Sequence, residues 1–418
     1  MWVAIPDSPD FWLRDATLAD GSRADLRIRD GVIAAVAPSG TAADGVALRG
    51  AMVLPCFADV HTHLDKGHIW PRSPNRDGTF AGALEAVMAD RERSWSAADM
   101  EARFAFGLRC AHAHGTAAIR THLDTYLPHA RQSWAVFSRL RDAWAGRIAL
   151  QAVSICPIER FAGDGGAAIA DLVAEHGGIL GFVTRADGAI PPGFEALLDH
   201  CLALADERGL DLDLHVDEND QAASATLPLI ARAALRRRFK GRIQAGHVCS
   251  LALQDDATIA ATIRLVADAG ISVVSLPMCN MYLQGRGPGR TPRWRGVTLL
   301  HELAAAGVPV SLASDNCRDP FYAYGDHDML EVFREAVRIA HLDHPIGRWS
   351  DAVAATPARI MGREAAIREG APADLVILRA RAWHEALSRH QADRIVLRAG
   401  RPIDTTLPDY AELDDLFD

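Results

Sequence analysis

Apolar runs of strand length recur along the middle of the chain and alternate with Ala-rich stretches of helical spacing, such as residues 194–208 and 255–269. Eight strand–helix units over about 260 residues predict a (β/α)8 barrel of the TIM type within the α/β class. An open, doubly wound parallel sheet is the alternative. The expected strands are Met52–Val60, Ala117–Thr121, Ala149–Cys156, Ile179–Val183, Leu210–His215, Ile243–His247, Ile271–Leu276 and Val308–Ser314.

The two ends of the chain have a different pattern. Residues 11–50 and 370–404 contain short alternating pieces broken by turn residues, which is typical of antiparallel strands. We therefore expect a small β-sandwich made by residues 1–52 and 365–418 together, beside a barrel of residues 53–364. The acidic residues 409–418 are expected to form a loose tail.

Composition narrows the class of protein. Of the 418 residues, 49% are hydrophobic, yet no apolar run reaches the ~18 residues of a membrane span. The net charge of −10 argues against nucleic-acid binding. Seven scattered cysteines without a CxxC pair, and no visible secretory signal, predict a cytoplasmic protein with reduced thiols. Assembly into a homo-oligomer is left open.

Two histidines follow the first expected strand, in the segment Leu54–Lys66. His61 and His63 are two residues apart, so on a strand both side chains point to one face and can share a divalent metal. His112 and His114 have the same spacing. They follow a stretch of helical pattern, where residues at this spacing point apart and cannot share a metal.

Other chemical residues stand at the carboxyl ends of later strands, where barrel enzymes place their chemistry. Imidazole and carboxylate groups from three strands are expected to bind one divalent metal ion. Zinc or iron suits these ligands, and so does manganese. Such a metal lowers the pKa of bound water to about 7. The expected ligands are His61, His63, His215 and Asp315, with His247 and Glu218 placed to position water and carry a proton.

Several motifs together resemble the amidohydrolase superfamily, and most closely its cytosine-deaminase branch. The resemblance spans roughly residues 12 to 405. It rests on His61-Thr-His-Leu-Asp65, Arg120-Thr-His-Leu-Asp124, His215-x-x-Glu218, Gly-His247, Leu283-Gln-Gly-Arg286, Ser-Asp315 and Asp319-Pro-Phe-Tyr-x-Tyr-Gly325.

The resemblance implies hydrolytic deamination of an aminated N-heterocycle, in which metal-bound hydroxide attacks the amidine carbon and ammonia leaves. It implies that Glu218 passes a proton to the ring nitrogen and that His247 and Asp315 activate the water. A hydrolase of the same scaffold that cleaves a cyclic amide or an N-alkyl substituent is the alternative. A metal-binding scaffold without activity is a third reading, which the presence of both Glu218 and His247 disfavours.

The sequence differs from this branch at residues that are expected to contact the substrate. The loop Ser154-Ile-Cys156-Pro-Ile-Glu159-Arg lacks the branch's ring-binding Gln, Asn316 replaces an Asp, and Phe321 replaces a Trp. These changes predict a ring other than cytosine: a cytosine analogue, isoguanine, a pterin or a related ring. The expected substrate-binding residues are Gln284, Asn316, Phe321 and Cys156.

The roles of three residues near the expected site, His122, Asp124 and Lys66, each have two interpretations. His122 and Asp124 either line the pocket, or Asp124 pairs with Arg120 as a structural ion pair. Lys66 resembles a bridging, carbamylated lysine, but in binuclear relatives that lysine ends strand 4. The segment Gly181–Arg185 has none, so one metal ion is expected.

Overall fold

Parallel strands occupy the centre of the molecule in the structure, a computed structural model that describes residues 2–184 and 188–417. One sheet has the order β6 (Phe57–Thr62), β7 (Thr116–Asp124), β8 (Ala149–Ile155). The other sheet has the order β13-β12-β11-β10-β9, and all its neighbours are parallel. Its strands are β9 (Val183–Thr184), β10 (Leu212–Val216), β11 (Ile243–His247), β12 (Ser272–Ser275) and β13 (Val310–Leu312).

Isolated parallel bridges join the two sheets at both sides. Thr62 pairs with Asp315 on one side, and on the other Val153 pairs with Ile179 and Pro157 with Val183. The strands are short but almost fully buried, which explains why the sequence shows them as continuous apolar runs. The predicted α/β class with parallel strands is confirmed.

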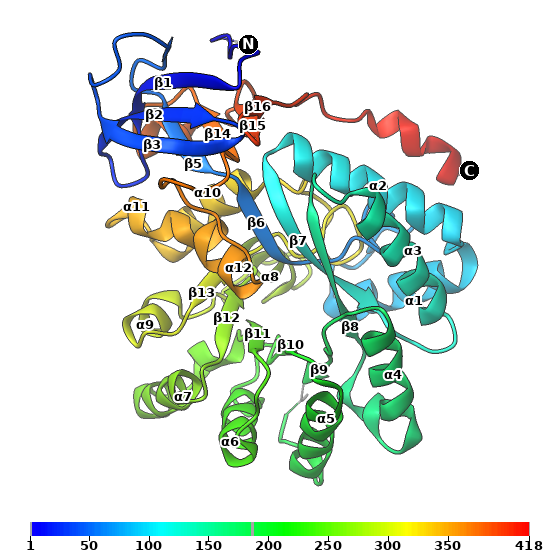
Figure 1. The fold of residues 1–418 in the computed structure, drawn as a ribbon. Helices are drawn as coiled ribbons and strands as arrows, with labels where there is room; N and C mark the ends of the chain where they lie inside the picture. The colour runs from blue at the N-terminus through cyan, green and yellow to red at the C-terminus, as the bar shows by residue number, and fades with distance from the viewer. Residues whose placement is uncertain (1, 185–187, 418) are drawn as a thin grey trace.

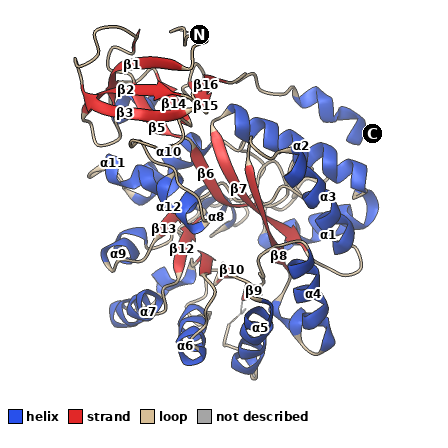
Figure 2. Ribbon diagram, viewed as in Figure 1, coloured by secondary structure: helices blue, strands red, loops and turns tan. Residues whose placement is uncertain are grey.

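Helices lie outside the parallel strands, as Figures 1 and 2 show. Their apolar faces pack on the strands in one core that includes Trp134, Phe137, Phe182 and Phe333. The helices are α1 (Phe80–Ser94), α2 (Ala97–Ala113), α3 (Ala130–Ala143), α4 (Asp164–Glu175), α5 (Phe194–Arg208), α6 (Leu227–Arg237), α7 (Asp256–Asp268), α8 (Pro277–Leu283), α9 (Leu300–Ala305), α10 (Met329–Ala340), α11 (Ile346–Trp349), α12 (Ala355–Ile360) and α13 (Trp383–Ser388).

Both ends of the chain build one further sheet, at the upper left of Figure 1. Its order is β16-β15-β14-β5-β1-β2-β3, with β4 beside β1. Side chains of its strands form a separate apolar core, which includes Leu13, Leu26, Ile377 and Leu397. The strands are β1 (Asp10–Thr17), β2 (Arg23–Arg29), β3 (Val32–Pro38), β4 (Val46–Ala47), β5 (Met52–Pro55), β14 (Leu375–Leu378), β15 (Ile395–Arg398) and β16 (Arg401–Pro402).

The first expected barrel strand, Met52–Val60, is wrong as a single strand. It divides at Cys56 into β5, which pairs with β14, and β6, which pairs with β7. The backbone changes partner at that point: the Cys56 N–H donates to Asp374, and the Phe57 N–H donates to Gly115. Pro55 has no N–H to donate, which suits the end of a strand.

The acidic C-terminal residues are docked, so the expectation of a loose tail is also wrong. They form a 3-10 helix, η4 (Tyr410–Leu416), that lies along α2 in Figure 1. Leu413 packs on Phe106 and Cys110 of α2, and Glu412 pairs with Arg109 at 2.6 Å. A local sequence pattern does not show this docking, because it depends on one leucine meeting a distant helix.

Within the described residues, every helix is too short or too polar to cross a membrane.

Candidate metal centre and active site

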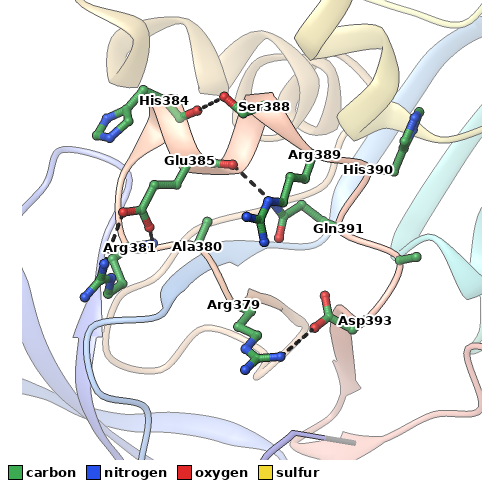
Figure 3. A pocket seen from close by; sticks show the side chains of 11 residues that line it. Arg379, Ala380, Arg381, His384, Glu385, Ser388, Arg389, His390, Gln391 and Asp393 are labelled. Atoms are coloured by element: carbon green, nitrogen blue, oxygen red, sulfur yellow. Dashed lines mark hydrogen bonds and ion pairs between the residues drawn. The ribbon is translucent and has the colours of Figure 1, made fainter.

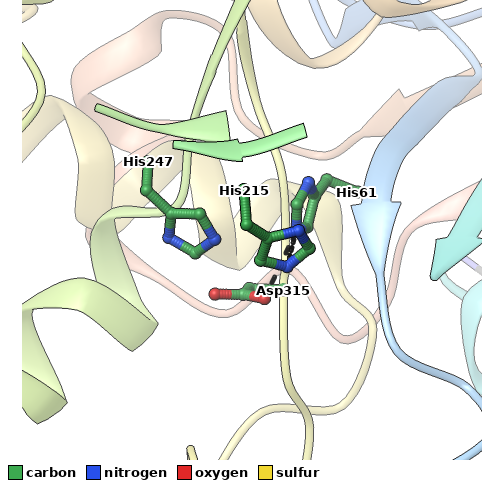
Figure 4. Close-up of side chains that lie close together, drawn as sticks. All are labelled: His61, His215, His247 and Asp315. Carbon is green, nitrogen blue, oxygen red and sulfur yellow. Dashed lines mark hydrogen bonds and ion pairs between the residues drawn. The ribbon is translucent and has the colours of Figure 1, made fainter. Parts of the chain in front are cut away.

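Four of the predicted residues converge at the carboxyl ends of the parallel strands. His61 lies on β6, His63 follows it, His215 lies on β10, and Asp315 follows β13. The His215 Nε2 atom is 3.2 Å from His61 Nε2 and 3.3 Å from His63 Nε2. The Asp315 Oδ1 atom is 3.2 Å from His63 Nε2 and 3.6 Å from His61 Nε2. Figure 4 shows three of these side chains and His247 pointing toward one another.

Burial controls the charge of this cluster. It lowers the pKa of His61, His63 and His215 well below the ordinary value, and it raises the pKa of Asp315 to about 7. The imidazoles are therefore neutral and have lone pairs to offer. Among the described residues, no N–H or O–H group donates a hydrogen bond to the Asp315 carboxylate, and only the weakly donating Cys279 thiol forms a hydrogen bond with it. Neutral imidazoles and a buried, largely unsatisfied carboxylate fit a divalent cation.

A second group of side chains lies beside this cluster. The Asn280 Nδ2 amide of α8 donates to Glu218 Oε1 at 3.2 Å and to His247 Nδ1 at 2.9 Å. An amide nitrogen only donates, so His247 Nδ1 is an acceptor and a neutral ring carries its proton on Nε2. Burial lowers the pKa of His247 to about 3, which keeps the ring neutral. His247 Nε2 has no partner among the described residues.

Sequence reasoning missed Asn280. It follows β12 by a few residues, after Pro277 at the start of α8. Strand 7 was expected near that point, and a search for amides as well as acids and histidines after each strand would have found it.

A cavity of about 340 Å³ opens over both groups. Among the predicted substrate-binding residues, Cys156, Asn316 and Phe321 line it. Gln284 is not among the lining residues of the described chain, and its amide donates to the Glu218 carbonyl at 3.4 Å. The lining also includes residues for which no role was predicted: Phe80, Leu84, Val87, Tyr126 and Glu159.

Lys66 and Asp124 also line the cavity and form a buried ion pair of 2.5 Å. Arg91 contacts the second Asp124 oxygen at 2.8 Å. The expected pair of Arg120 with Asp124 is wrong: Arg120 contacts Asp213 at 2.8 Å instead. Asp124 is therefore part of the cavity wall.

His122 is buried next to the candidate metal ligands. Its ring centre is 3.9 Å from that of His61, and its Nε2 atom is 3.4 Å from Asp213 Oδ1. It does not appear among the lining residues of the cavity in the described chain.

The histidine pair of α2 does not converge. His114 contacts Asp326 at 3.0 Å, whereas the His112 ring meets Trp144 edge to face.

A more voluminous cavity of about 810 Å³ lies around α13 (Figure 3). Four of its charged residues form two ion pairs: Arg381 contacts Glu385 at 3.3 Å, and Arg379 lies 3.7 Å from Asp393. None of the described metal-type clusters includes a residue of its lining. The α13 cavity therefore lacks the metal-type ligands that line the smaller cavity over His215 and Asp315 in the described chain.

Known proteins of similar sequence and structure identify the family of the chain. The amidohydrolase family matches residues 182–404. A pterin deaminase of Rhizobium rhizogenes (strain K84) is 57% identical over 400 residues, which is 94% of this chain and 90% of that protein. An N-isopropylammelide isopropyl amidohydrolase of Pseudomonas sp. (strain ADP) is 25% identical, over 87% of this chain and 89% of that protein.

Among solved structures, the 5-methylcytosine deaminase of Klebsiella pneumoniae liganded with 5-fluorocytosine has a TM-score of 0.81 and 25% identity. The alignment covers 96% of this chain and 98% of that one. The resemblance to heterocycle deaminases and the predicted class, a hydrolase of C–N bonds in N-heterocycles, are confirmed. The chain belongs to the amidohydrolase family.

Proposed function

We propose that this protein hydrolyses the exocyclic amino group of a pterin-like ring and releases ammonia. The observation that carries the proposal is the convergence of His61, His63, His215 and Asp315 beside the linked pair Glu218 and His247. The high identity to a pterin deaminase over nearly the whole chain supports this ring over cytosine.

The metal is assigned to His61, His63, His215 and Asp315. Three imidazoles and one carboxylate suit zinc or iron. When bound, such a cation supplies the Lewis acidity that makes water a nucleophile at neutral pH.

The proton-handling roles are assigned to Glu218 and His247. The carboxylate of Glu218 lies 3.5 Å from His247 Nδ1, and Asn280 donates to both. Glu218 delivers a proton to the ring nitrogen next to the amidine carbon, which makes that carbon electrophilic. His247 and Asp315 hold the attacking water in position. The Asp315 carboxylate takes the proton that the attacking water loses and passes it to the amino group, which then leaves as ammonia.

The cavity wall supports a planar, partly polar substrate. Phe80 and Phe321 meet edge to face, with ring centres 5.4 Å apart, on one part of the wall. Cys156 and Asn316 also line the cavity, and Asn316 can both donate and accept. These residues are proposed to bind the ring, together with Gln284, whose contact with the Glu218 carbonyl places it next to the acid.

The decisive experiment measures ammonia release by metal-replete protein with pterin, isoguanine, 5-methylcytosine and cytosine. Fastest turnover is expected with pterin. Glu218→Gln should lower kcat by about 10²–10⁴-fold, the range for a general acid or base, with full metal content. Glu302→Gln, on an exposed face of α9, is the matched control. If aminated rings release no ammonia and an N-alkylated ring releases an amine, the alternative hydrolase is correct.

We also infer the larger arrangement from the same contacts. The bridges from Thr62 to Asp315 and from Val153 to Ile179 support one closed eight-stranded barrel that ends near residue 364 and begins at β6, a few residues later than the expected boundary at residue 53. The separate core of the terminal sheet supports a second domain, packed as a β-sandwich, of residues 2–55 and 365–417, because β5 pairs with β14. All seven cysteines are free and buried, which supports a reducing compartment such as the cytoplasm.

A further inference from the structure

A second cluster of metal-type ligands is buried in the described chain, away from the cavity lining. His68, Cys317 and His327 are each at most 2% exposed, and their donor atoms lie within 4.8 Å of one another. None of the three lines the 340 Å³ cavity.

The two imidazoles of this cluster have no hydrogen-bond partner among the described residues. Both ring nitrogens of His68 and both of His327 are unsatisfied. A buried polar group without a partner costs free energy, and four such atoms in one place need an explanation. A cation would satisfy one nitrogen of each ring.

The packing around the cluster is close. His68 meets Phe106 of α2 edge to face at 4.9 Å. A methyl group at Gly107 would lie 3.0 Å from His327 Nε2, so the ring approaches the helix only because that residue is glycine. Gly107 of α2 therefore leaves space for the His327 ring, and the donor atoms of His68, Cys317 and His327 lie within 4.8 Å of one another.

We propose that His68, Cys317 and His327 bind a thiophilic d¹⁰ cation of the Zn²⁺ type, in a structural site distinct from the active-site metal. Bonds of about 2.0–2.3 Å join Zn²⁺ to nitrogen and sulfur, and the three donor atoms, all within 4.8 Å of one another, are close enough to bind one such ion after small side-chain movements. Binding breaks the Cys317 S–H bond, forms an S–Zn bond and releases one proton to water. Three protein ligands leave a fourth position for water.

The site joins the two loops that carry active-site ligands. His68 lies in the loop after His61 and His63, and Cys317 follows Asp315. The loops already touch through the backbone: the N–H of His68 donates to Cys317 at 3.1 Å, and that of Trp70 donates to Arg318 at 2.9 Å. A cation there would fix the position of His61 and His63 relative to Asp315.

Metal content and thiolate spectroscopy test the site without measuring activity. Protein produced with zinc is expected to hold two metal ions per chain, and Cys317→Ser one. Cobalt-substituted protein should show a thiolate-to-cobalt charge-transfer band that Cys317→Ser abolishes. Cys279→Ser is the matched control, because Cys279 lies near Asn316 at the other site, and it should keep the band.

Two further measurements separate this site from the active site. Asp315→Asn should lose one metal ion and keep the charge-transfer band. Should Cys317→Ser fail to fold, X-ray absorption at the zinc edge of the unmodified protein must show one sulfur ligand for two zinc ions. One metal ion per chain, or a zinc spectrum without sulfur, would overturn the proposal.

Discussion

Asn280 is the residue that joins Glu218 and His247, the two residues proposed to handle protons. Its amide donates to both Glu218 and His247, so it fixes the orientation of the acid and the tautomer of the imidazole together. A carboxylate at this position could only accept, and an aliphatic side chain could do neither.

Replacement of Asn280 should therefore impair turnover more than binding. Asn280→Leu is expected to lower kcat by about 10–100-fold, the usual cost of removing a residue that orients a catalytic group, with metal content unchanged. Steady-state ammonia release and metal analysis test this. A variant with normal kcat and only a raised KM would contradict the role.

Asp124 is a second residue whose replacement should have a definite effect, here on the free energy of unfolding. It pairs with buried Lys66 and with Arg91, so Asp124→Asn leaves the Lys66 charge without its partner. We expect the free energy of unfolding to fall by about 3–5 kcal/mol, the cost of breaking a buried pair. Lys66→Met should cost less, because Asp124 keeps Arg91. Denaturant titration of both variants tests the order, and equal losses would contradict it.

At the scale of elements, β11 leaves space for His61, a proposed metal ligand on β6 of the other parallel sheet. Gly246 precedes His247, and a methyl group there would lie 3.1 Å from Cε1 and 3.2 Å from Nδ1 of His61. The glycine therefore leaves room for the His61 ring between strands.

Gly246→Ala should push that ring by a few tenths of an ångström and weaken metal binding about tenfold, since small shifts of ligands are costly. Competition with a chromogenic chelator measures the affinity, and circular dichroism reports whether the fold persists. Unchanged affinity in a folded variant would show that the ring adapts freely.

The elements also show what sequence patterns can predict. The parallel strands are buried, mostly apolar runs, and a polar residue stands at or just after the carboxyl end of several of them, so the approximate positions of His61, His215, His247 and Asp315 follow from periodicity. The split at Cys56 does not, because an apolar run carries no mark of the residue at which the backbone changes partner.

The sequence pattern also does not show which side chains, distant in the chain, contact each other in the fold. Arg120 contacts Asp213 rather than Asp124, and Leu413 docks on α2. Both depend on which side chains the folded chain brings together. Asn280 differs, because its position after an expected strand is visible in the sequence. It was missed because only acids and histidines, and not amides, were considered at strand ends.

At the scale of the whole molecule, one buried ion pair connects the terminal sheet to the helical layer. Arg394, next to β15, forms two hydrogen bonds with Asp328 at the start of α10, at 2.6 and 2.7 Å. Burial alone would raise the pKa of Asp328, but the Arg394 guanidinium outweighs burial and lowers the pKa to about 2.

This pair should contribute stability that depends on pH in a known direction. The folded pKa is below the unfolded value, so the contribution is complete above pH ~4 and is lost as the pH falls toward 2. A shift of this size corresponds to about 2 kcal/mol. Denaturant midpoints of metal-free wild type and Asp328→Asn should converge as the pH falls from 5 to 2, to about the same value. A constant difference would contradict the linkage.

The terminal sheet has a consequence for synthesis. β5 touches β1 only at Met52, while all four of its residues pair with β14, which lies near the other end of the chain. During synthesis, β5 therefore cannot pair with β14 until most of the chain has been translated. The nascent protein therefore exposes a hydrophobic strand edge for most of translation, which is the kind of surface that chaperones cover.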